Sequence, residues 1–196
     1  MSTPKTLTDE QCQALIEQLQ KDYSTESQYV KATRNSCIAV VLLEAGIRVG
    51  ELCGLRINDL WFSDQPVRCL VVRKEIAKNN KERLIPISLR LNVAIKTMNE
   101  LLWSPVSASP CSFAFFARPD CGPLTTRSVE RFISSAGNKA FNQNVTPHML
   151  RHTFATRLMR KTNARNVQEL LGHESLQSTQ IYMHPNMDDL IEAINS

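Results

Sequence analysis

The apolar run at 37–43, Cys-Ile-Ala-Val-Val-Leu-Leu, places the strongest constraint on how this chain can fold. It lies inside a helical pattern that follows a polar connector at 21–28 and stops at Gly46. A helix that is apolar on nearly every side must be covered by other elements all round. The sequence therefore predicts a central buried helix. A chain of 196 residues, 42% of them hydrophobic, is long enough to cover it as one soluble globular domain.

Further helices are predicted where a capping residue precedes apolar residues spaced three or four apart. The first of them opens with a capping-box pattern, Thr-Asp-Glu-Gln at 8–11, and the short one ending at Gly172 has the glycine typical of a helix C-terminus. The expected helical segments begin at Thr8, Ser88, Thr125, Thr146, Asn166, Ser178 and Asn186.

Between residues 59 and 87 the apolar pattern changes to the alternation of strands. Three short antiparallel strands are expected at 60–62, 67–74 and 83–87, with a turn at 78–81 between the last two. The fold class is therefore mainly α with a small three-stranded antiparallel sheet, an α+β arrangement. The proline- and serine-rich region 104–124 is expected to be loop.

Composition excludes several kinds of protein and leaves one kind of partner open. The formal net charge of +4 permits a polyanionic partner, but a slightly basic surface explains it equally well. Six cysteines without any C-x-x-C pair are typical of reduced thiols in a cytosolic protein, not of a disulfide framework or a zinc site. No apolar run is long enough to cross a membrane, and the polar start lacks a signal-peptide core.

The stretch Thr-Pro-His-Met-Leu-Arg-His-Thr at 146–153 predicts an anchored helix that presents reactive side chains. A threonine followed by proline is a helix-start signal. At 3.6 residues per turn, His148, Arg151 and His152 share one face, opposite an apolar stripe. An imidazole beside a guanidinium suits a phosphate, because the planar arginine binds two oxygens while the histidine moves a proton.

Two other charged positions have ordinary explanations when each is taken alone. Arg48 follows a glycine break and lies three residues before Glu51, so a surface salt bridge at a helix start is the favoured interpretation there. Lys78 lies at a hairpin tip, where lysines are usually only solvated.

Five pieces of the chain, taken together, resemble the tyrosine recombinase (phage integrase) family in order and spacing. They are Ala-Gly-Ile-Arg-Val-Gly-Glu-Leu at 45–52, Lys-Asn-Asn-Lys-Glu-Arg-Leu-Ile-Pro at 78–86, His-Met-Leu-Arg-His-Thr at 148–153, Leu-Leu-Gly-His at 170–173 and Thr-Gln-Ile-Tyr at 179–182. The resemblance covers essentially the whole chain. It implies a site-specific recombinase or integrase that breaks and rejoins DNA through a covalent 3′-phosphotyrosyl intermediate, with no cofactor and no metal.

The resemblance also implies a set of site residues. The catalytic residues would be Arg48, Lys78, His148, Arg151, His173 and the nucleophile Tyr182, with Glu51 in support. Two guanidiniums would stabilise the negative charge that builds on the non-bridging phosphate oxygens. His148 would take the proton of Tyr182, whose ordinary pKa near ~10 makes it a poor nucleophile at neutral pH. Lys78 would return a proton to the departing sugar oxygen.

The partner implied by the resemblance is double-stranded DNA. Candidate DNA contacts are Arg127, Arg131, Lys81 and Arg83, although a plain basic surface explains the outward arginines of the 125 helix as well. The chain would assemble on DNA as a tetrameric synapse and be monomeric or weakly associated without it. No membrane partner is expected. The setting would be cytoplasmic and nucleoid-associated, in a prokaryote or a mobile element.

The resemblance covers one domain of the family. We expect a single catalytic domain over 1–196, without the amino-terminal core-binding domain that most members carry. The chain would then be either an excised fragment or one of the short recombinases.

Two alternatives from other classes remain open. His148 and His152 lie four residues apart, as in helical zinc sites, but Met149 stands where zinc hydrolases need glutamate and no third ligand is obvious. A metal-dependent hydrolase is therefore disfavoured. The second alternative is a recombinase-like protein that binds DNA without strand cleavage.

Overall fold

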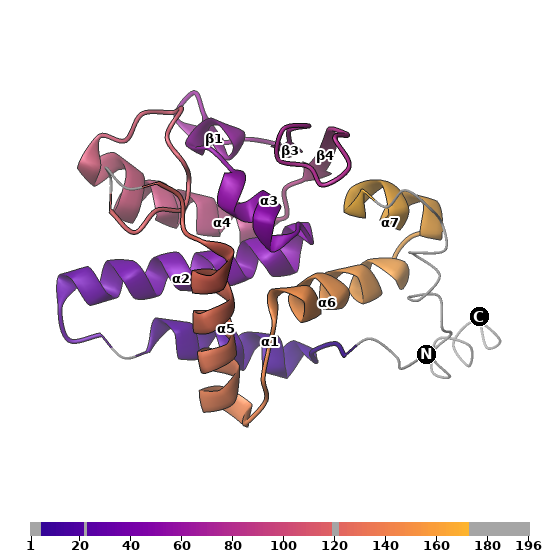
Figure 1. The fold of residues 1–196 in the computed structure, drawn as a ribbon, viewed down its shortest axis with the longest axis horizontal. Coiled ribbons are helices and arrows are strands. Elements are labelled where there is room, and N and C mark those ends of the chain that lie inside the picture. Colours follow the sequence, from indigo (N-terminus) through magenta and orange to yellow (C-terminus); the bar gives the residue numbers. More distant parts are fainter. Residues whose placement is uncertain (1–4, 22, 119–121, 173–196) are drawn as a thin grey trace.

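The structure is a computed structural model that describes residues 5–21, 23–118 and 122–172. Figure 1 shows a mainly helical body in which α2 runs through the middle, α5 crosses in front of it, and α6 and α7 lie on one side. The helices are α1 (Asp9–Gln20), α2 (Glu26–Ala45), α3 (Val49–Gly54), α4 (Leu89–Met98), α5 (Thr126–Phe141), α6 (Pro147–Met159) and α7 (Ala164–Leu171). His173, Tyr182 and the helical segments expected from Ser178 and Asn186 lie outside the described residues.

The central helix α2 confirms the main sequence prediction. Residues 32–43 are all buried, and α2 packs against α1, α4 and α6. It ends at Gly46, whose φ of +58° is in the left-handed region. A Cβ at this position would lie 2.1 Å from Cδ1 of Phe154, a residue of α6. Gly46 is therefore required both by its conformation and by the close approach of that ring.

The helix caps were predicted well because they depend on neighbouring residues. Thr8 and Gln11 form the reciprocal capping box at the start of α1, with bonds of 3.0 and 3.2 Å. Ser88 caps α4, which continues into a π-helical turn and a short 3-10 turn at Asn99–Trp103 and Ser104–Val106. Helix α7 begins at Ala164, two residues earlier than expected, because the side chain of Asn163 caps it.

The predicted three-stranded sheet is wrong. The described residues contain two separate antiparallel pairs, β1 (Trp61–Phe62) with β2 (Gln65–Pro66), and β3 (Cys69–Val72) with β4 (Arg83–Pro86). Ser63 and Asp64 both have positive φ, as in the tight turns that close two-residue hairpins. This turn pairs β1 locally with β2. Pro66 has no amide hydrogen to donate to a third strand.

The described cysteines are free and mostly buried, in line with the prediction of reduced core thiols. Cys12, Cys37 and Cys53 are buried, Cys69 is partly buried, and Cys111 is exposed. Burial raises the pKa of Cys37 to about 12 and that of Cys53 to about 11, so both thiols are held in the unreactive protonated form. Among the described residues, no helix is both long enough and apolar enough to span a membrane.

Candidate active site

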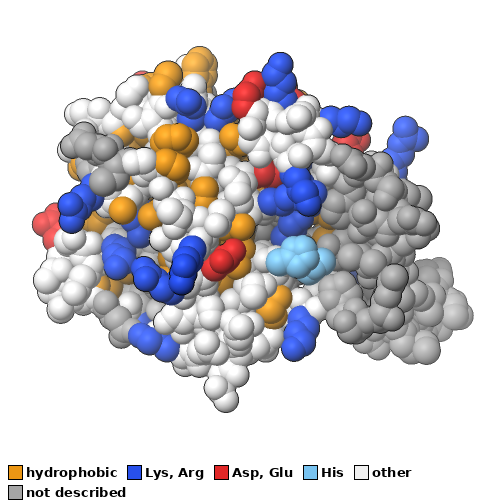
Figure 2. Space-filling view, in the orientation of Figure 1, with side chains coloured by type: hydrophobic (Ala, Val, Ile, Leu, Met, Phe, Trp, Pro, Cys, Tyr) orange, Lys and Arg blue, Asp and Glu red, His pale blue; other side chains and the backbone are white. Residues whose placement is uncertain are grey.

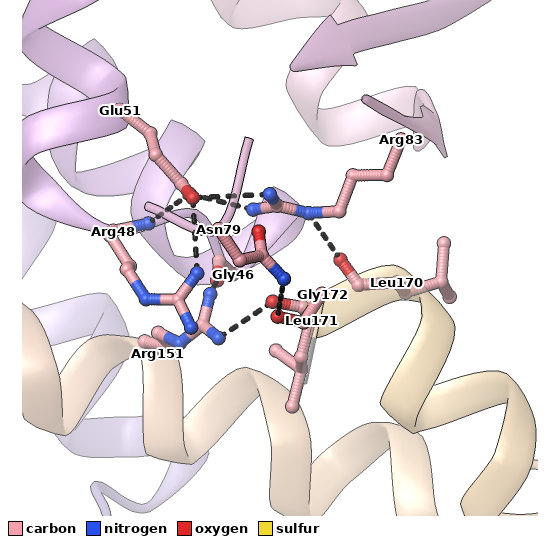
Figure 3. Close-up of polar contacts among 9 residues, drawn as sticks. All are labelled: Gly46, Arg48, Glu51, Asn79, Arg83, Arg151, Leu170, Leu171 and Gly172. Carbon is pink, nitrogen blue, oxygen red and sulfur yellow. Dashed lines mark hydrogen bonds and ion pairs between the residues drawn. The ribbon is translucent and has the colours of Figure 1, made fainter. Parts of the chain in front are cut away.

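Glu51 is the centre of a buried polar network (Figure 3). Its carboxylate accepts a hydrogen bond from the backbone N–H of Arg48 at 2.8 Å and another from Nη1 of Arg48 at 3.1 Å. Two more come from Arg83, Nη1 at 3.1 Å and Nη2 at 2.6 Å. The residue is only 2% exposed. The surface salt bridge expected for Arg48 and Glu51 is therefore wrong, because the pair belongs to a buried network with a third member.

The arginines keep the buried Glu51 ionised. Burial by itself would raise its pKa, but the hydrogen bonds and charge of Arg83, followed by those of Arg48, outweigh burial and lower it. Removing one partner from a buried ion pair usually costs about 3–5 kcal/mol, because the other charge is left uncompensated. Glu51 therefore stabilises the packing of Arg48 and Arg83 and fixes the position of the Arg48 side chain.

Arg83 is placed differently from the sequence prediction, which made it a DNA contact. It is buried, and beyond its two bonds to Glu51 its Nε donates to the carbonyl of Leu170 at 3.0 Å. Its guanidinium thus joins α3 to the end of α7 and is occupied by internal contacts. Sequence reasoning missed this because the partners lie 32 and 87 residues away.

Arg151, on α6, is also anchored from two sides. Its Nη1 donates to the carbonyl of Gly46 at 2.5 Å, and its Nη2 donates to the carbonyl of Leu171 at 2.8 Å. It is 3% exposed. The guanidinium is therefore held between the end of α2 and the end of α7. In the view of Figure 3 it overlaps the guanidinium of Arg48, and the charges of both arginines act on His148.

The two histidines of α6 contact each other, as their shared face predicted. The ring centroids of His148 and His152 are 4.0 Å apart in an edge-to-face arrangement. Partial burial and the charges of Arg151 and Arg48 lower the pKa of His148. Burial, His148 and Arg151 lower the pKa of His152 to about 4. Both rings are therefore neutral at pH 7, and a neutral His148 can accept a proton.

The depressed pKa of His152 predicts an acid-sensitive fold. In the unfolded chain His152 is protonated as the pH falls through 6.5, whereas in the folded protein it is protonated only near pH 4. The free energy of unfolding should therefore fall as the pH drops through this window, by on the order of 3 kcal/mol for a shift of this size. Urea unfolding of wild-type and His152→Phe proteins at several pH values measures it.

The His152→Phe variant should show a flatter dependence on pH, because its ring does not titrate. The contribution of Glu51 is separate, because a lowered carboxyl pKa loses its stabilising effect only below about pH 4.5. Equal pH dependence of the two proteins between pH 6.5 and 4.5 would contradict the assignment.

The remaining predicted site residues are more exposed or lie outside the described part. Lys78 is exposed in the turn between β3 and β4, and its neighbour Asn79 donates from Nδ2 to the carbonyl of Gly172 at 3.3 Å. The turn therefore lies against the end of α7. His173, which follows Gly172 in sequence, and the predicted nucleophile Tyr182 are not described.

A groove between α1, α2 and α5 carries positive charge, and we call it the basic groove. It has a volume of about 630 Å³, and the described residues that line it include no aspartate or glutamate. Its cations are Lys21, Lys31, Arg34, Arg131 and Lys139. Figure 2 shows lysine and arginine side chains spread over the molecular face on which a histidine is also visible. Sequence reasoning found only Arg131; it missed Lys139 on the same helix, and Lys21, Lys31 and Arg34, which come from elements distant in sequence.

Arg34 is the least exposed of the groove cations. It is buried, donating to the carbonyl of Phe116 at 2.8 Å and to Oδ1 of Asn35. Burial lowers its pKa to about 10, so it remains charged at neutral pH. Three of the four DNA contacts predicted from sequence, Arg127, Arg131 and Lys81, are exposed, unlike the fourth, Arg83.

The histidine pair also bears on the metal-hydrolase alternative. In the described ranges, no group of three or more histidine, cysteine, aspartate or glutamate side chains is arranged to hold a metal ion. His148 and His152 therefore find no third ligand in that part of the chain.

Comparison with known sequences finds one family over nearly the whole chain. The model of the phage integrase family matches residues 5–189. Tyrosine recombinase XerA of Pyrococcus furiosus is 38% identical over 192 residues, which cover 97% of this chain and 61% of that protein. Tyrosine recombinase XerC of Pseudomonas syringae pv. tomato is 34% identical over 196 residues, covering 98% and 60%. The chain thus spans about three fifths of the length of these relatives.

Solved structures agree on the fold. The crystal structure of XerA recombinase aligns with a TM-score of 0.74 at 31% identity, covering 99% of this chain and 65% of that one. The XerH site-specific recombinase, bound to a palindromic difH substrate in a post-cleavage complex, aligns with a TM-score of 0.75 at 25% identity, covering 98% and 53%. The mainly helical arrangement with small antiparallel ladders is that of tyrosine recombinase catalytic domains.

Proposed function

The chain belongs to the phage integrase family, and from this premise we propose that it is a tyrosine-type site-specific DNA recombinase. It would break and rejoin DNA strands through a covalent 3′-phosphotyrosyl intermediate. One observation supports this most directly. The Glu51 carboxylate holds Arg48, two backbone carbonyls hold Arg151, and the charges of both arginines act on a neutral His148, which is an arrangement suited to a reacting phosphodiester.

The chemistry follows from the types of side chain. The hydroxyl oxygen of Tyr182 would attack phosphorus, forming the tyrosine–phosphate bond while the bond from phosphorus to the 5′ oxygen breaks. His148 would take the tyrosine proton, and Lys78 would give a proton to the leaving oxygen. Arg48 and Arg151 would stabilise the charge on the non-bridging oxygens. The phosphotyrosyl ester stores the bond energy, so rejoining would need neither a nucleotide cofactor nor a metal.

Preorganisation supports the roles of the arginines. Arg151 is already held by two backbone carbonyls, and Arg48 by a buried carboxylate. Neither guanidinium needs to be ordered when charge develops on the phosphate, and such fixed groups stabilise a transition state better than mobile ones.

Double-stranded DNA would be the partner, and two features favour it. The relative XerH is described in complex with its difH substrate. The basic groove and the exposed Lys81, Arg127 and Arg131 supply cations for phosphates. Assembly into a tetramer on DNA, and action at the nucleoid in the cytoplasm, are further parts of this proposal.

A nicked or suicide duplex that carries the target site would test the function. Wild-type protein should form an adduct with the DNA strand that survives denaturation, because the linkage is covalent. Specific binding of the duplex with no such adduct under any condition would instead favour the alternative, a recombinase-like DNA-binding protein without strand cleavage.

The proposed DNA contact predicts weak, salt-sensitive binding by the isolated chain. With a net charge of +4, it should neutralise few phosphates and lose affinity quickly as salt rises. Lys31→Ala and Arg131→Ala should each reduce the slope of log affinity against log salt by about 0.9, the expected effect of one lost phosphate contact. Fluorescence anisotropy with a labelled duplex at several salt concentrations measures this slope.

Lys96, exposed on α4 and absent from the basic groove, provides the control. Lys96→Ala should leave the salt slope unchanged. Tight binding that resists salt, or an equal effect of the Lys96 and Lys31 variants, would show that the basic groove is not where DNA binds.

A further inference from the structure

The end of α7 is held by three side chains from three different elements (Figure 3). The carbonyls of Leu170, Leu171 and Gly172 accept hydrogen bonds from Arg83 Nε at 3.0 Å, Arg151 Nη2 at 2.8 Å and Asn79 Nδ2 at 3.3 Å, respectively. Carbonyls in the last turn of a helix have no partner within the helix, and the negative end of the helix attracts cations. The donors come from β4, α6 and the turn between β3 and β4.

Gly172 allows this close approach. Its φ is +61°, and a Cβ there would lie 3.1 Å from Cδ of Arg83. The end of α7 therefore packs directly onto the hairpin that carries Lys78. Arg83, after the turn, bonds to Leu170, and Asn79, within the turn and next to Lys78 in sequence, bonds to Gly172.

Asn79 has a feature that a purely structural turn residue would not need. Its Oδ1 is buried and has no hydrogen-bond partner in the described part of the chain, while Nδ2 bonds to Gly172. An unpaired buried oxygen is unfavourable, and such groups call for an explanation other than stability. The contact made by Nδ2 is a functional reason for keeping an amide at this place.

We propose that Asn79 is a positioning residue, which holds the turn against the end of α7 and so sets the point from which Lys78 reaches the leaving oxygen. The lysine side chain is long and flexible, so the place of its backbone decides how often the amine is in reach. This inference rests on the proposed function and on Lys78 as the acid.

The test compares two substrates that differ in one atom. A bridging 5′ sulfur departs as an anion and needs no proton, so a variant that misplaces Lys78 should be slow only on the oxygen substrate. Asn79→Ala should form the covalent adduct about 10- to 100-fold more slowly on ordinary DNA, the usual effect of a small misplacement. It should be close to the wild-type rate on the sulfur substrate. Asn79→Asp, which sets an acceptor against the carbonyl of Gly172, should be slower than Asn79→Ala on ordinary DNA.

Asn80→Gly is the matched control. Asn80 is exposed in the same turn with a φ of +51°, which glycine adopts without strain, so this variant should match the wild type on both substrates. Thermal unfolding of each variant checks that the fold is kept.

A double-variant cycle separates positioning of Lys78 from a general loosening of the hairpin. Adding Asn79→Ala to Lys78→Ala should not lower the rate of adduct formation on ordinary DNA any further, because the residue through which Asn79 acts is already gone. Three results would each overturn the inference while wild-type cleavage stands. They are full additivity of the two rate losses, an equal loss of rate by Asn79→Ala on both substrates, and no loss of rate by Asn79→Ala on either substrate. Absence of any adduct with the wild-type protein would instead overturn the proposed function, and this inference with it.

Discussion

The Tyr182→Phe variant is expected to lose the covalent DNA adduct completely while keeping its affinity for DNA. The change removes one hydroxyl, which would be the attacking group, and leaves the aromatic ring in place. No other oxygen would then be positioned to attack phosphorus. Incubation of wild-type and variant proteins with a suicide substrate, followed by denaturing electrophoresis, measures the adduct.

A second tyrosine controls for the loss of a hydroxyl as such. Tyr23 is 51% exposed at the surface, and Tyr23→Phe should form the adduct at the wild-type rate. A Tyr182→Phe protein that still cleaved nicked DNA would rule Tyr182 out as nucleophile. Loss of the adduct in both variants would point to misfolded protein, and circular dichroism of the two variants shows whether they are folded.

The Lys78→Ala variant should be slow on ordinary DNA by ~100- to 10,000-fold, the usual contribution of general acid catalysis. Its rate should be nearly normal when sulfur replaces the bridging 5′ oxygen, since that leaving group departs without a proton. The exposed position of Lys78 in the turn suits a side chain that swings into place when DNA binds. Single-turnover cleavage of the two substrates measures the selective rescue.

Two neighbouring lysines test whether the assignment is specific. Lys74 and Lys81 belong to the same hairpin region, and Lys74→Ala and Lys81→Ala should show no selective rescue by sulfur. Rescue of Lys81→Ala alone would move the acid three residues along the chain. If no variant were rescued, the hairpin would serve to position DNA and the acid would lie elsewhere.

The parts of the fold that were predicted from sequence depend on residues close together in the chain. The capping box of Thr8 and Gln11, the cap at Ser88 and the end of the central helix at Gly46 are local features, and each was confirmed. The all-round apolar pattern of α2 also identified the central helix, because burial on every side leaves no polar face. The shared face of His148 and His152 follows from helical geometry alone.

The errors came from partners that are distant in sequence. Three strands were expected in one sheet, but the turn at 63–64 pairs β1 with β2, a segment outside the three expected strands, so β1 does not join the pair of β3 and β4. Glu51 was interpreted as the partner of Arg48 alone, since no neighbouring residue in the sequence indicates that Arg83 also bonds to its carboxylate. Asn79 was passed over for a similar reason, because its partner Gly172 is 93 residues away.

One signal could have identified Glu51 as a buried residue. It lies between apolar residues in a short helix, at a position where Leu52 and Cys53 are buried as well. A carboxylate in such surroundings requires a cation from elsewhere in the fold. Arg83, in a strand whose other residues are all apolar, was available for that role.

The buried Glu51 also decides how much charge the cluster retains. Within the described part of the chain, the cluster comprises the guanidiniums of Arg48, Arg83 and Arg151 and the carboxylate of Glu51, so the formal charges of these four side chains sum to two positive charges. A resting phosphodiester carries one negative charge and gains more on its oxygens as attack proceeds. A surplus of two positive charges matches the reacting phosphate better than the resting one. Stronger stabilisation of the transition state than of the ground state is what lowers the activation barrier. A second acid beside Glu51 would halve that surplus, and a neutral residue in place of Glu51 would leave the arginines repelling one another.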